Sequence, residues 1–357
     1  MKQLMLATLL FLLAMSASTF GDDKDVERGK TENIRAANAS EATYKIEAGL
    51  DGEIYPVLAN YASLQKPLQR KLGVVSVKVS NPGSALLRES VSVTILGWSD
   101  QEIQFAQLGP GVSKTFVFAP TFLPRFYQNH EIVAATAQVT VTEASGQRVY
   151  ETTVPVRLRS SEDMYWGGNF EYAPMIASWV TPHDQRVETI LASAKNYLPD
   201  RRLPGYEGWK AAPQQEEETF REAKAIFNAL KQKGLSYVKS SSTLGDHETS
   251  SERVRMPRTS LQESSANCID AAVMYASLFE NLGMDSTVVI VPGHAYAGVR
   301  VAAGSKKFLF LDVALTGRTS FEMAVASAER GLARYAPSSV TKIVISDARH
   351  AGIYPLP

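Results

Sequence analysis

The hydrophobic residues of this chain change their spacing part-way along it. From Thr43 to Arg159, apolar and polar residues alternate in short runs such as Gly73 to Ser80, and turn residues such as Asn81-Pro82-Gly83 separate the runs. From Thr181 onward, apolar residues first recur at the spacing of a helix face. Alternation is the period of a strand, and about 3.6 residues is that of a helix. The sequence therefore predicts an α+β chain in which a β-rich domain precedes one that begins with helices.

We place the first domain at residues 43–160. Its many short runs, with no convincing helical stretch among them, predict an immunoglobulin-like β-sandwich. Cys268 is the only cysteine of the chain, so this sandwich lacks the disulfide of antibody domains. Two roles stay open for it: structural support, and binding of a ligand or partner.

The residues before this domain have the pattern of an exported protein. Residues 1–21 resemble a secretory signal peptide, because Lys2 precedes the apolar run from Leu4 to Met15 and small residues follow. The run is too short to span a bilayer comfortably, so we expect no transmembrane segment in the mature chain. Residues 22–42 are polar and without periodicity, which predicts a flexible leader. The expected location is secreted or periplasmic.

Residues 161–185 are rich in aromatic residues and glycine. We interpret them as a linker that docks the two domains, with an aromatic groove beside a functional site as the alternative. A second domain follows at residues 186–357. Residues 239–258 are polar and without periodicity, which predicts an exposed loop. Whether this loop covers a site or is ordinary surface stays open.

Cys268 lies where a helix is expected to begin. Apolar residues follow it at helical spacing as far as Leu282, and Gly283 gives a stop signal. Asn267 is a favourable N-cap, and Asp270 stands where a capping box needs an acceptor. Cys268 then occupies the first helical turn, where free N–H groups and the helix dipole favour a thiolate.

Two downstream strands carry the expected partners of this thiol. The run from His294 to Ala302 alternates, which places His294 on the polar face opposite its apolar residues. The next run, Phe308 to Val313, contains Asp312, an acid that is costly in an apolar strand unless it has a partner. A histidine on the neighbouring strand supplies one. The order Cys268, His294, Asp312 fits nucleophilic thiol catalysis with a base and an orienting acid.

Several short motifs in the C-terminal half resemble the transglutaminase-like cysteine hydrolases, and in particular uncharacterised secreted bacterial members of that group. They are Trp179-Val180-Thr181-Pro182, Leu203-Pro204-Gly205-Tyr206, Arg255-Met256-Pro257, Asn267-Cys268-Ile269-Asp270, Val291-Pro292-Gly293-His294-Ala295 and Phe310-Leu311-Asp312. The resemblance implies a papain-like fold for residues 186–357. It also implies Cys268 as nucleophile, His294 as base and Asp312 as orienting acid. The activities it implies are hydrolysis of an amide or peptide and acyl transfer to an amine, through a thioester.

A further candidate is Gln262, six residues before Cys268. Papain-like enzymes place a glutamine at such a distance to bind the oxyanion, and the backbone N–H of Cys268 is the other expected donor. A solvated loop glutamine is the structural alternative. Gln262 is therefore the fourth predicted site residue.

Composition and spacing narrow the expected ligands and partners. Lys plus Arg and Asp plus Glu each number 37, and the resulting zero net charge argues against a nucleic-acid partner. The histidines lack metal-ligand spacing and no glycine-rich phosphate loop follows a strand, so we expect neither a metal nor a nucleotide cofactor. We expect a peptide or protein substrate, with the cell envelope as one place where it would occur. The alternative function is a catalytically inactive transglutaminase-like module that binds such a partner.

Overall fold

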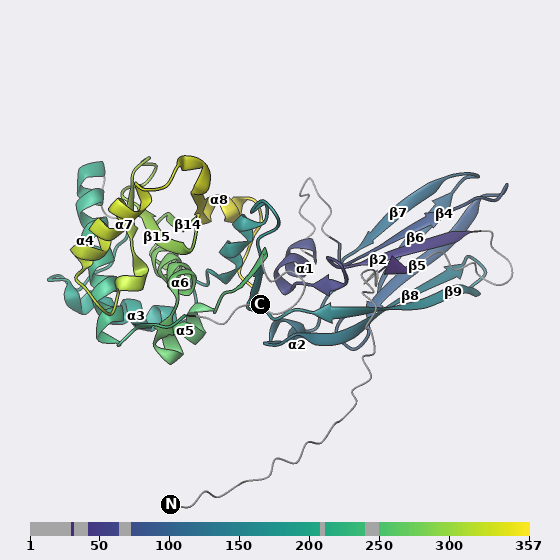
Figure 1. Cartoon of the computed structure of the whole chain (residues 1–357), viewed down its shortest axis with the longest axis horizontal. Coiled ribbons are helices and arrows are strands. Elements are labelled where there is room, and N and C mark those ends of the chain that lie inside the picture. Colours follow the sequence, from purple (N-terminus) through teal and green to yellow (C-terminus); the bar gives the residue numbers. More distant parts are fainter. Residues whose placement is uncertain (1–29, 32–41, 64–72, 208–210, 240–249) are drawn as a thin grey trace, which may run out of the picture.

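The structure is a computed structural model that describes residues 30–31, 42–63, 73–207, 211–239 and 250–357. It is a mixed α+β fold with several sheets. Two halves lie end to end along the long axis of the molecule, one built from strands and the other from helices around a small sheet (Figure 1). The predicted signal peptide falls outside the described residues, as does most of the predicted leader.

Two sheets build the N-terminal half. A four-stranded antiparallel sheet has the order β1-β2-β4-β7, and a five-stranded sheet has the order β3-β9-β8-β5-β6. Their bounds are β1 (Lys30–Thr31), β2 (Thr43–Ala48), β4 (Val75–Ser80), β7 (Ser113–Phe118), β3 (Glu53–Ile54), β9 (Arg148–Leu158), β8 (Val133–Glu143), β5 (Leu87–Ile95) and β6 (Glu102–Leu108). All neighbours are antiparallel except β3 and β9. Strand β1 lies within the predicted leader and pairs with β2, so that segment is not wholly unstructured.

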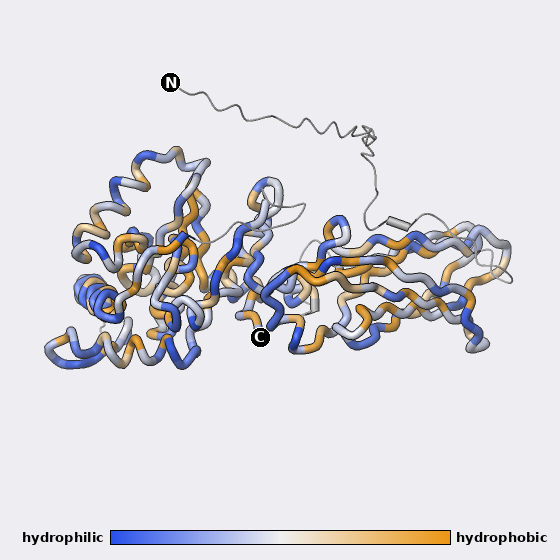
Figure 2. The backbone as a smooth tube through the Cα atoms, turned by 60° about the horizontal axis from the view of Figure 1, so that its bottom comes forward, coloured by the Kyte–Doolittle hydropathy of each residue, from blue (hydrophilic) through white to orange (hydrophobic). Residues whose placement is uncertain are grey.

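Alternation along the strands creates the core of this half. In β4, Val75, Val77 and Val79 are buried while the residues between them are more exposed. In β5, Val91, Val93 and Ile95 are buried in the same way. Because successive side chains point to opposite faces of a sheet, each strand gives one apolar face to the interior. Figure 2 shows hydrophobic stretches, in orange, along the strands of this half.

The prediction that residues 43–160 contain no helix is wrong. Helix α1 (Pro56–Ser63) follows β3, and a short helix, α2 (Pro124–Tyr127), follows β7. In α1, Val57, Leu58, Ala59 and Tyr61 are all buried. A short helix that is buried on most sides has no polar face, so its sequence lacks the amphipathic spacing by which helices are recognised.

The C-terminal half surrounds a four-stranded antiparallel sheet of order β16-β15-β14-β17. Its strands are β14 (Ser286–Val291), β15 (His294–Arg300), β16 (Phe308–Leu311) and β17 (Thr341–Val344). The helices are α3 (Gln185–Ala194), α4 (Ala212–Gln232), α5 (Pro257–Glu263), α6 (Cys268–Asn281), α7 (Phe321–Leu332) and α8 (Ile345–His350). Helix α6 packs against β14 and β15, and α7 packs against β16.

Both faces of β15 are covered, contrary to the expectation of a polar face. Ala295, Ala297 and Val299 belong to the main core that includes α6. Tyr296, from the other face, is buried in a smaller cluster with Ala328 of α7. The smaller cluster arises because α7 lies over this side of the sheet. His294 is half-buried at the start of the strand.

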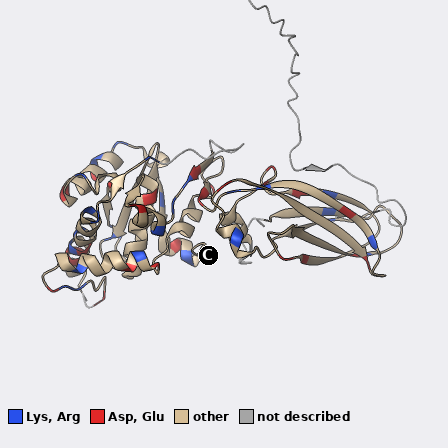
Figure 3. Ribbon diagram, turned by 90° about the horizontal axis from the view of Figure 1, so that it is seen from below, with Lys and Arg blue, Asp and Glu red and all other residues tan. Residues whose placement is uncertain are grey.

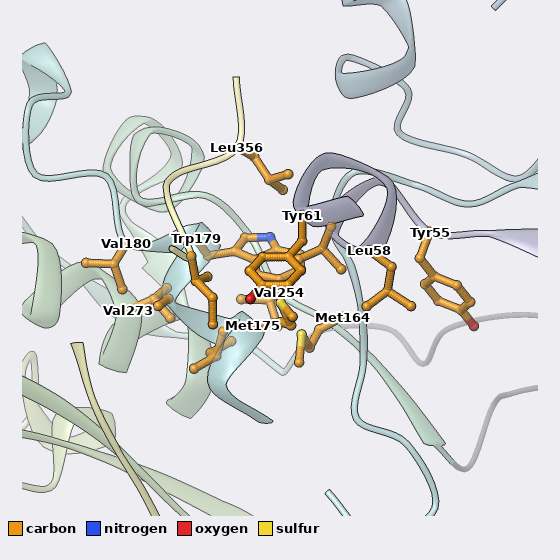
Figure 4. Packing of buried hydrophobic residues seen from close by; sticks show 14 of the residues in the cluster. Tyr55, Leu58, Tyr61, Met164, Met175, Trp179, Val180, Val254, Val273 and Leu356 are labelled. Atoms are coloured by element: carbon orange, nitrogen blue, oxygen red, sulfur yellow. The ribbon is translucent and has the colours of Figure 1, made fainter. Parts of the chain in front are cut away.

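The linker and helix α1 join the two halves. The linker contains strand β10 (Asp163–Tyr165) and the 3₁₀ helix η1 (Ala173–Trp179). Figure 4 shows side chains of α1 directed toward those of the linker, among them Tyr61, Met164 and Trp179. The Tyr61 hydroxyl also donates to the carbonyl of Ala351, 3.1 Å away. Buried contacts of this kind hold helix α1 against the linker and the C-terminal half.

Surface charge and helix length give two further observations. Basic and acidic residues are interspersed along the ribbon of both halves (Figure 3), in keeping with the balanced composition. Within the described ranges, none of the helices combines the length and the apolar character that crossing a bilayer requires.

Candidate functional site

Cys268 is the first residue of α6, as predicted, and a capping box holds it there. The Asn267 side chain accepts from the Asp270 N–H at 2.8 Å, and the Asp270 carboxylate accepts from the Asn267 N–H at 3.1 Å. Arg255 clamps the same carboxylate with its Nε at 2.9 Å and its backbone N–H at 2.8 Å. Asp270 is fully buried, so this charged contact compensates for the loss of its hydration. The helix start is therefore fixed from two directions.

His294 is brought to the site by a tight turn. Strands β14 and β15 pair so that Val291 lies opposite His294, with Pro292 and Gly293 between them. Gly293 has a φ of 75°, a left-handed conformation that residues with a side chain adopt only with strain. The turn places His294 at the end of the sheet nearest the start of α6, where it lines a pocket together with Cys268.

Asp312 follows directly after β16 and meets the imidazole. His294 Nε2 and Asp312 Oδ1 are 3.0 Å apart, and the Ser327 hydroxyl donates to the second carboxylate oxygen at 2.8 Å. The Tyr296 ring packs edge-on against the imidazole, with the two ring centroids 4.6 Å apart. These three contacts restrict the rotation of the His294 ring. Because Nε2 faces Asp312, Nδ1 is the nitrogen left for the thiol.

The electrostatics of this group favour a protonated imidazole. Burial alone lowers the pKa of His294, but hydrogen bonds to Asp312 and to Cys268 outweigh it and raise the pKa to about 9. Burial likewise raises the pKa of Asp312, but the hydrogen bonds from His294 and Ser327 leave it below its usual value. The carboxylate and the imidazolium thus stabilise each other's charged forms.

Cys268 and His294 open into a pocket of about 640 Å³. Its walls come from the linker, from β12 (Ser251–Arg253), from the β14–β15 turn and from the segment before β17. The lining residues are Trp166, Gly168, Asn169, Phe170, Glu252, Cys268, Ile269, Ile290, Val291, Pro292, Gly293, His294, Ala295, Ser338, Ser339 and Thr341. Two aromatic residues of the linker, Trp166 and Phe170, thus line the same pocket as Cys268.

The structure does not bring Gln262 to this site. Gln262 lies exposed on α5, and its side-chain carbonyl accepts from Arg186 Nη2 of the neighbouring helix α3 at 3.0 Å. It is absent from the pocket lining. The role in oxyanion binding fails because α5 ends at Glu263 and the chain turns at Ser264, in a left-handed conformation, before it reaches Cys268. The first-turn N–H of Cys268 remains as the expected donor.

Glu252 and Trp166 belong to the pocket, although the sequence did not single them out as site residues. Strand β12 pairs with β10 in a register that sets Glu252 opposite Met164. The second part of the predicted exposed loop is therefore ordered, and Val254 and Met256, which follow β12, are buried. Residues 240–249 of that loop lie outside the described residues. The aromatic composition of the linker was the one available signal for Trp166.

Metal ligation is a separate question. In the part of the chain that the structure describes, no group of three or more His, Cys, Asp or Glu side chains is arranged to hold a metal ion.

Comparisons with known proteins give little further guidance. No protein-family model matches the chain, and no curated protein matches it. Among solved structures, a FixG-related protein from Vibrio parahaemolyticus is 16% identical and has a TM-score of 0.19. The match covers 34% of this chain and 98% of that one. This chain is similar to that protein only at a level that carries no argument about its fold or function.

Proposed function

We propose that this protein is a transglutaminase-like cysteine enzyme that hydrolyses or transfers an acyl group from an amide or ester. The supporting observation is that the half-buried His294 has Asp312 3.0 Å from one ring nitrogen and lines the same pocket as Cys268. A thiol at a capped helix start, an imidazole and an acid in this order make up the set that thiol catalysis needs.

The chemistry follows from these contacts. Sγ of Cys268 attacks the carbonyl carbon and forms a C–S bond, while the carbonyl oxygen becomes an oxyanion that the Cys268 N–H stabilises. The imidazolium of His294 gives its proton to the departing amine or alcohol as the bond to it breaks, leaving a thioester. His294 then takes a proton from water or from an amine, which attacks the thioester and releases Cys268. Asp312 keeps the ring oriented throughout.

The rest of the chain is proposed to serve this site. We assign residues 186–357 to a papain-like catalytic domain and residues 43–160 to an immunoglobulin-like β-sandwich. The assignment of the first half rests on its two sheets with alternating buried residues. The N-terminal residues support export, so we propose a secreted or periplasmic enzyme that acts on a peptide or protein, such as one of the cell envelope.

Acylation by p-nitrophenyl acetate tests the proposal without knowledge of the natural substrate. We expect a burst of p-nitrophenol and an acetyl group on the peptide that contains Cys268, removable by hydroxylamine as thioesters are. Cys268→Ala removes the adduct, His294→Gln slows its formation by at least about a hundredfold, and His183→Gln, at an exposed histidine, has no effect. Acylation no faster than that of a free thiol argues for the inactive binding module instead.

A further inference from the structure

Glu252 is the one acidic residue among those that line the Cys268 pocket in the described part of the chain. Strand β12 explains its direction. Ser251 and Arg253 point the other way, since the Ser251 hydroxyl lies 2.9 Å from that of Tyr55 and Arg253 binds Glu162 at 2.7 Å. Because side chains alternate along a strand, Glu252 faces the pocket, while Ser251 joins the strand to the N-terminal half and Arg253 joins it to the linker.

The carboxylate of Glu252 is held but retains capacity to accept. A contact with the Trp166 side chain lowers the pKa of this carboxyl group. A carboxylate accepts up to about four hydrogen bonds, so this contact leaves further acceptor positions. The Trp166 ring stacks on Phe170 with centroids 5.6 Å apart, and both rings line the same pocket. Glu252 therefore lies beside aromatic rings, which favour cations.

The charge around Glu252 is mostly negative. Burial and the nearby Asp270 raise its pKa to about 7, and Trp166 opposes them only in part. The pKa of Tyr237 is also raised, by burial and by Cys268, Asp270 and Glu252. Among the described lining residues there is no lysine or arginine, and the one cation is the imidazolium of His294, which is shared between Asp312 and the thiol. A half-buried carboxylate in such surroundings loses part of its hydration, which a bound cation would offset.

We propose that Glu252 is a specificity residue of this pocket, and that its carboxylate binds a primary ammonium group that the substrate carries near the carbonyl attacked by Cys268. An ammonium donates a charge-assisted hydrogen bond to the carboxylate and lies against the Trp166 and Phe170 rings. The inference rests on the proposed function, which it deepens by naming a substrate class. Amino termini and lysine-type side chains of peptides share this chemistry.

Thiol reagents of different charge test this electrostatic preference directly. We would measure the rates at which 2-aminoethyl, methyl and 2-sulfonatoethyl methanethiosulfonate modify Cys268 at pH 8, each divided by its rate with 2-mercaptoethanol. In the wild type the cationic reagent should be favoured over the neutral one by about tenfold, and the anionic one disfavoured. Glu252→Gln, which keeps an acceptor for Trp166, should remove most of this preference. Glu329→Gln, at an exposed carboxylate on α7, should keep it.

The outcomes separate this inference from the proposed function. An unchanged ratio in Glu252→Gln overturns the ammonium site. An equal loss of rate with all three reagents also overturns it, because Glu252 then acts on the thiol and not on the incoming cation. Slow modification of wild-type Cys268 by the neutral reagent counts against the proposed catalysis and leaves the ratio readable.

Three p-nitrophenyl esters extend the test to acyl substrates. With the p-nitrophenyl esters of N-acetyl-lysine and N-acetyl-norleucine, Glu252→Gln should raise KM about tenfold for the lysine ester alone and leave kcat nearly unchanged. The p-nitrophenyl ester of glycine, with its free amino group, tells whether an α-ammonium serves as well. Equal changes for all three esters contradict the proposal.

Discussion

Replacing Asp312 by asparagine isolates the contribution of its charge to the site. The substitution keeps the shape of the side chain and an oxygen that accepts from Ser327, but removes the negative charge 3.0 Å from His294 Nε2. A hydrogen bond to a charged group contributes about 1.5 to 3 kcal/mol. Since one pKa unit corresponds to about 1.4 kcal/mol, the pKa of His294 should fall by about one to two units. The expected pKa lies between about 7 and 8, down from about 9.

The sign of the effect determines how the thiol should respond. A lower pKa means that less of His294 is protonated at a given pH. At pH 8 the imidazolium fraction should fall from roughly 90% to roughly 25%, taking a pKa of about 7.5 for the variant. In the proposed function the imidazolium is the counter-ion of the Cys268 thiolate, so we expect alkylation of Cys268 at pH 8 to slow about fourfold in this variant. Turnover should fall by orders of magnitude, because asparagine also permits the wrong tautomer of His294.

NMR titration of the histidine rings measures the shift directly. The chain has 5 histidines, and His294→Gln identifies the resonance of interest. Ser327→Ala is the matched control, because it removes a hydrogen bond to Asp312 and leaves its charge in place; its effect on the pKa of His294 should be small. If the pKa of His294 in Asp312→Asn stays near 9, the carboxylate is not what stabilises the imidazolium, and the reasoning is wrong.

Three further substitutions test other parts of the structure. Burial raises the pKa of Glu222 to about 7, so its contribution to stability is present below about pH 4.5 and is lost as the pH rises through 7. In urea unfolding, the stability of Glu222→Gln relative to wild type should therefore rise by about 3 kcal/mol between pH 4.5 and 8. If the free energies of unfolding of the two proteins change in parallel with pH, this expectation is refuted. Arg255→Gln leaves the buried Asp270 without its cation and should cost roughly 3 kcal/mol in thermal unfolding; a loss below about 1 kcal/mol contradicts the clamp. The added methyl group of Gly293→Ala meets no atom within 4 Å, so the variant should fold with a loss of about 1 kcal/mol from its left-handed backbone. The strained turn should move His294 and slow alkylation of Cys268. An unchanged alkylation rate would show that this turn does not position His294.

Local signals made one part of the site predictable. The capping box of Asn267 and Asp270 involves only four consecutive residues, and the structure contains it as predicted. The turn before His294 is similarly local. The contact of His294 with Asp312 needed only two neighbouring antiparallel strands, and its geometry is present.

The parts that the sequence did not reveal depend on long-range packing. Glu252 reaches the pocket because β12 pairs with β10, and nothing in the polar run around it indicates that pairing. Gln262 has the expected separation from Cys268 along the chain, but the turn at the end of α5 directs it to Arg186. Helix α1 was not predicted because it is buried between the two halves and so lacks the polar face of an amphipathic helix. Sequence spacing alone does not give the direction of a side chain once the chain turns.

The central claim is that Cys268 and His294 act as an ion pair. The most direct measurement is the rate of Cys268 alkylation by iodoacetamide from pH 4 to 10 in wild type, His294→Gln and the exposed-histidine control His183→Gln. An ordinary thiol with a pKa of about 8.5 is only about 0.3% ionised at pH 6. The ion pair predicts that wild type and the control remain reactive well below pH 7 and that His294→Gln loses that acidic reactivity while approaching wild type near pH 10. Identical profiles in wild type and His294→Gln, both rising with the profile of a free cysteine, would contradict the account.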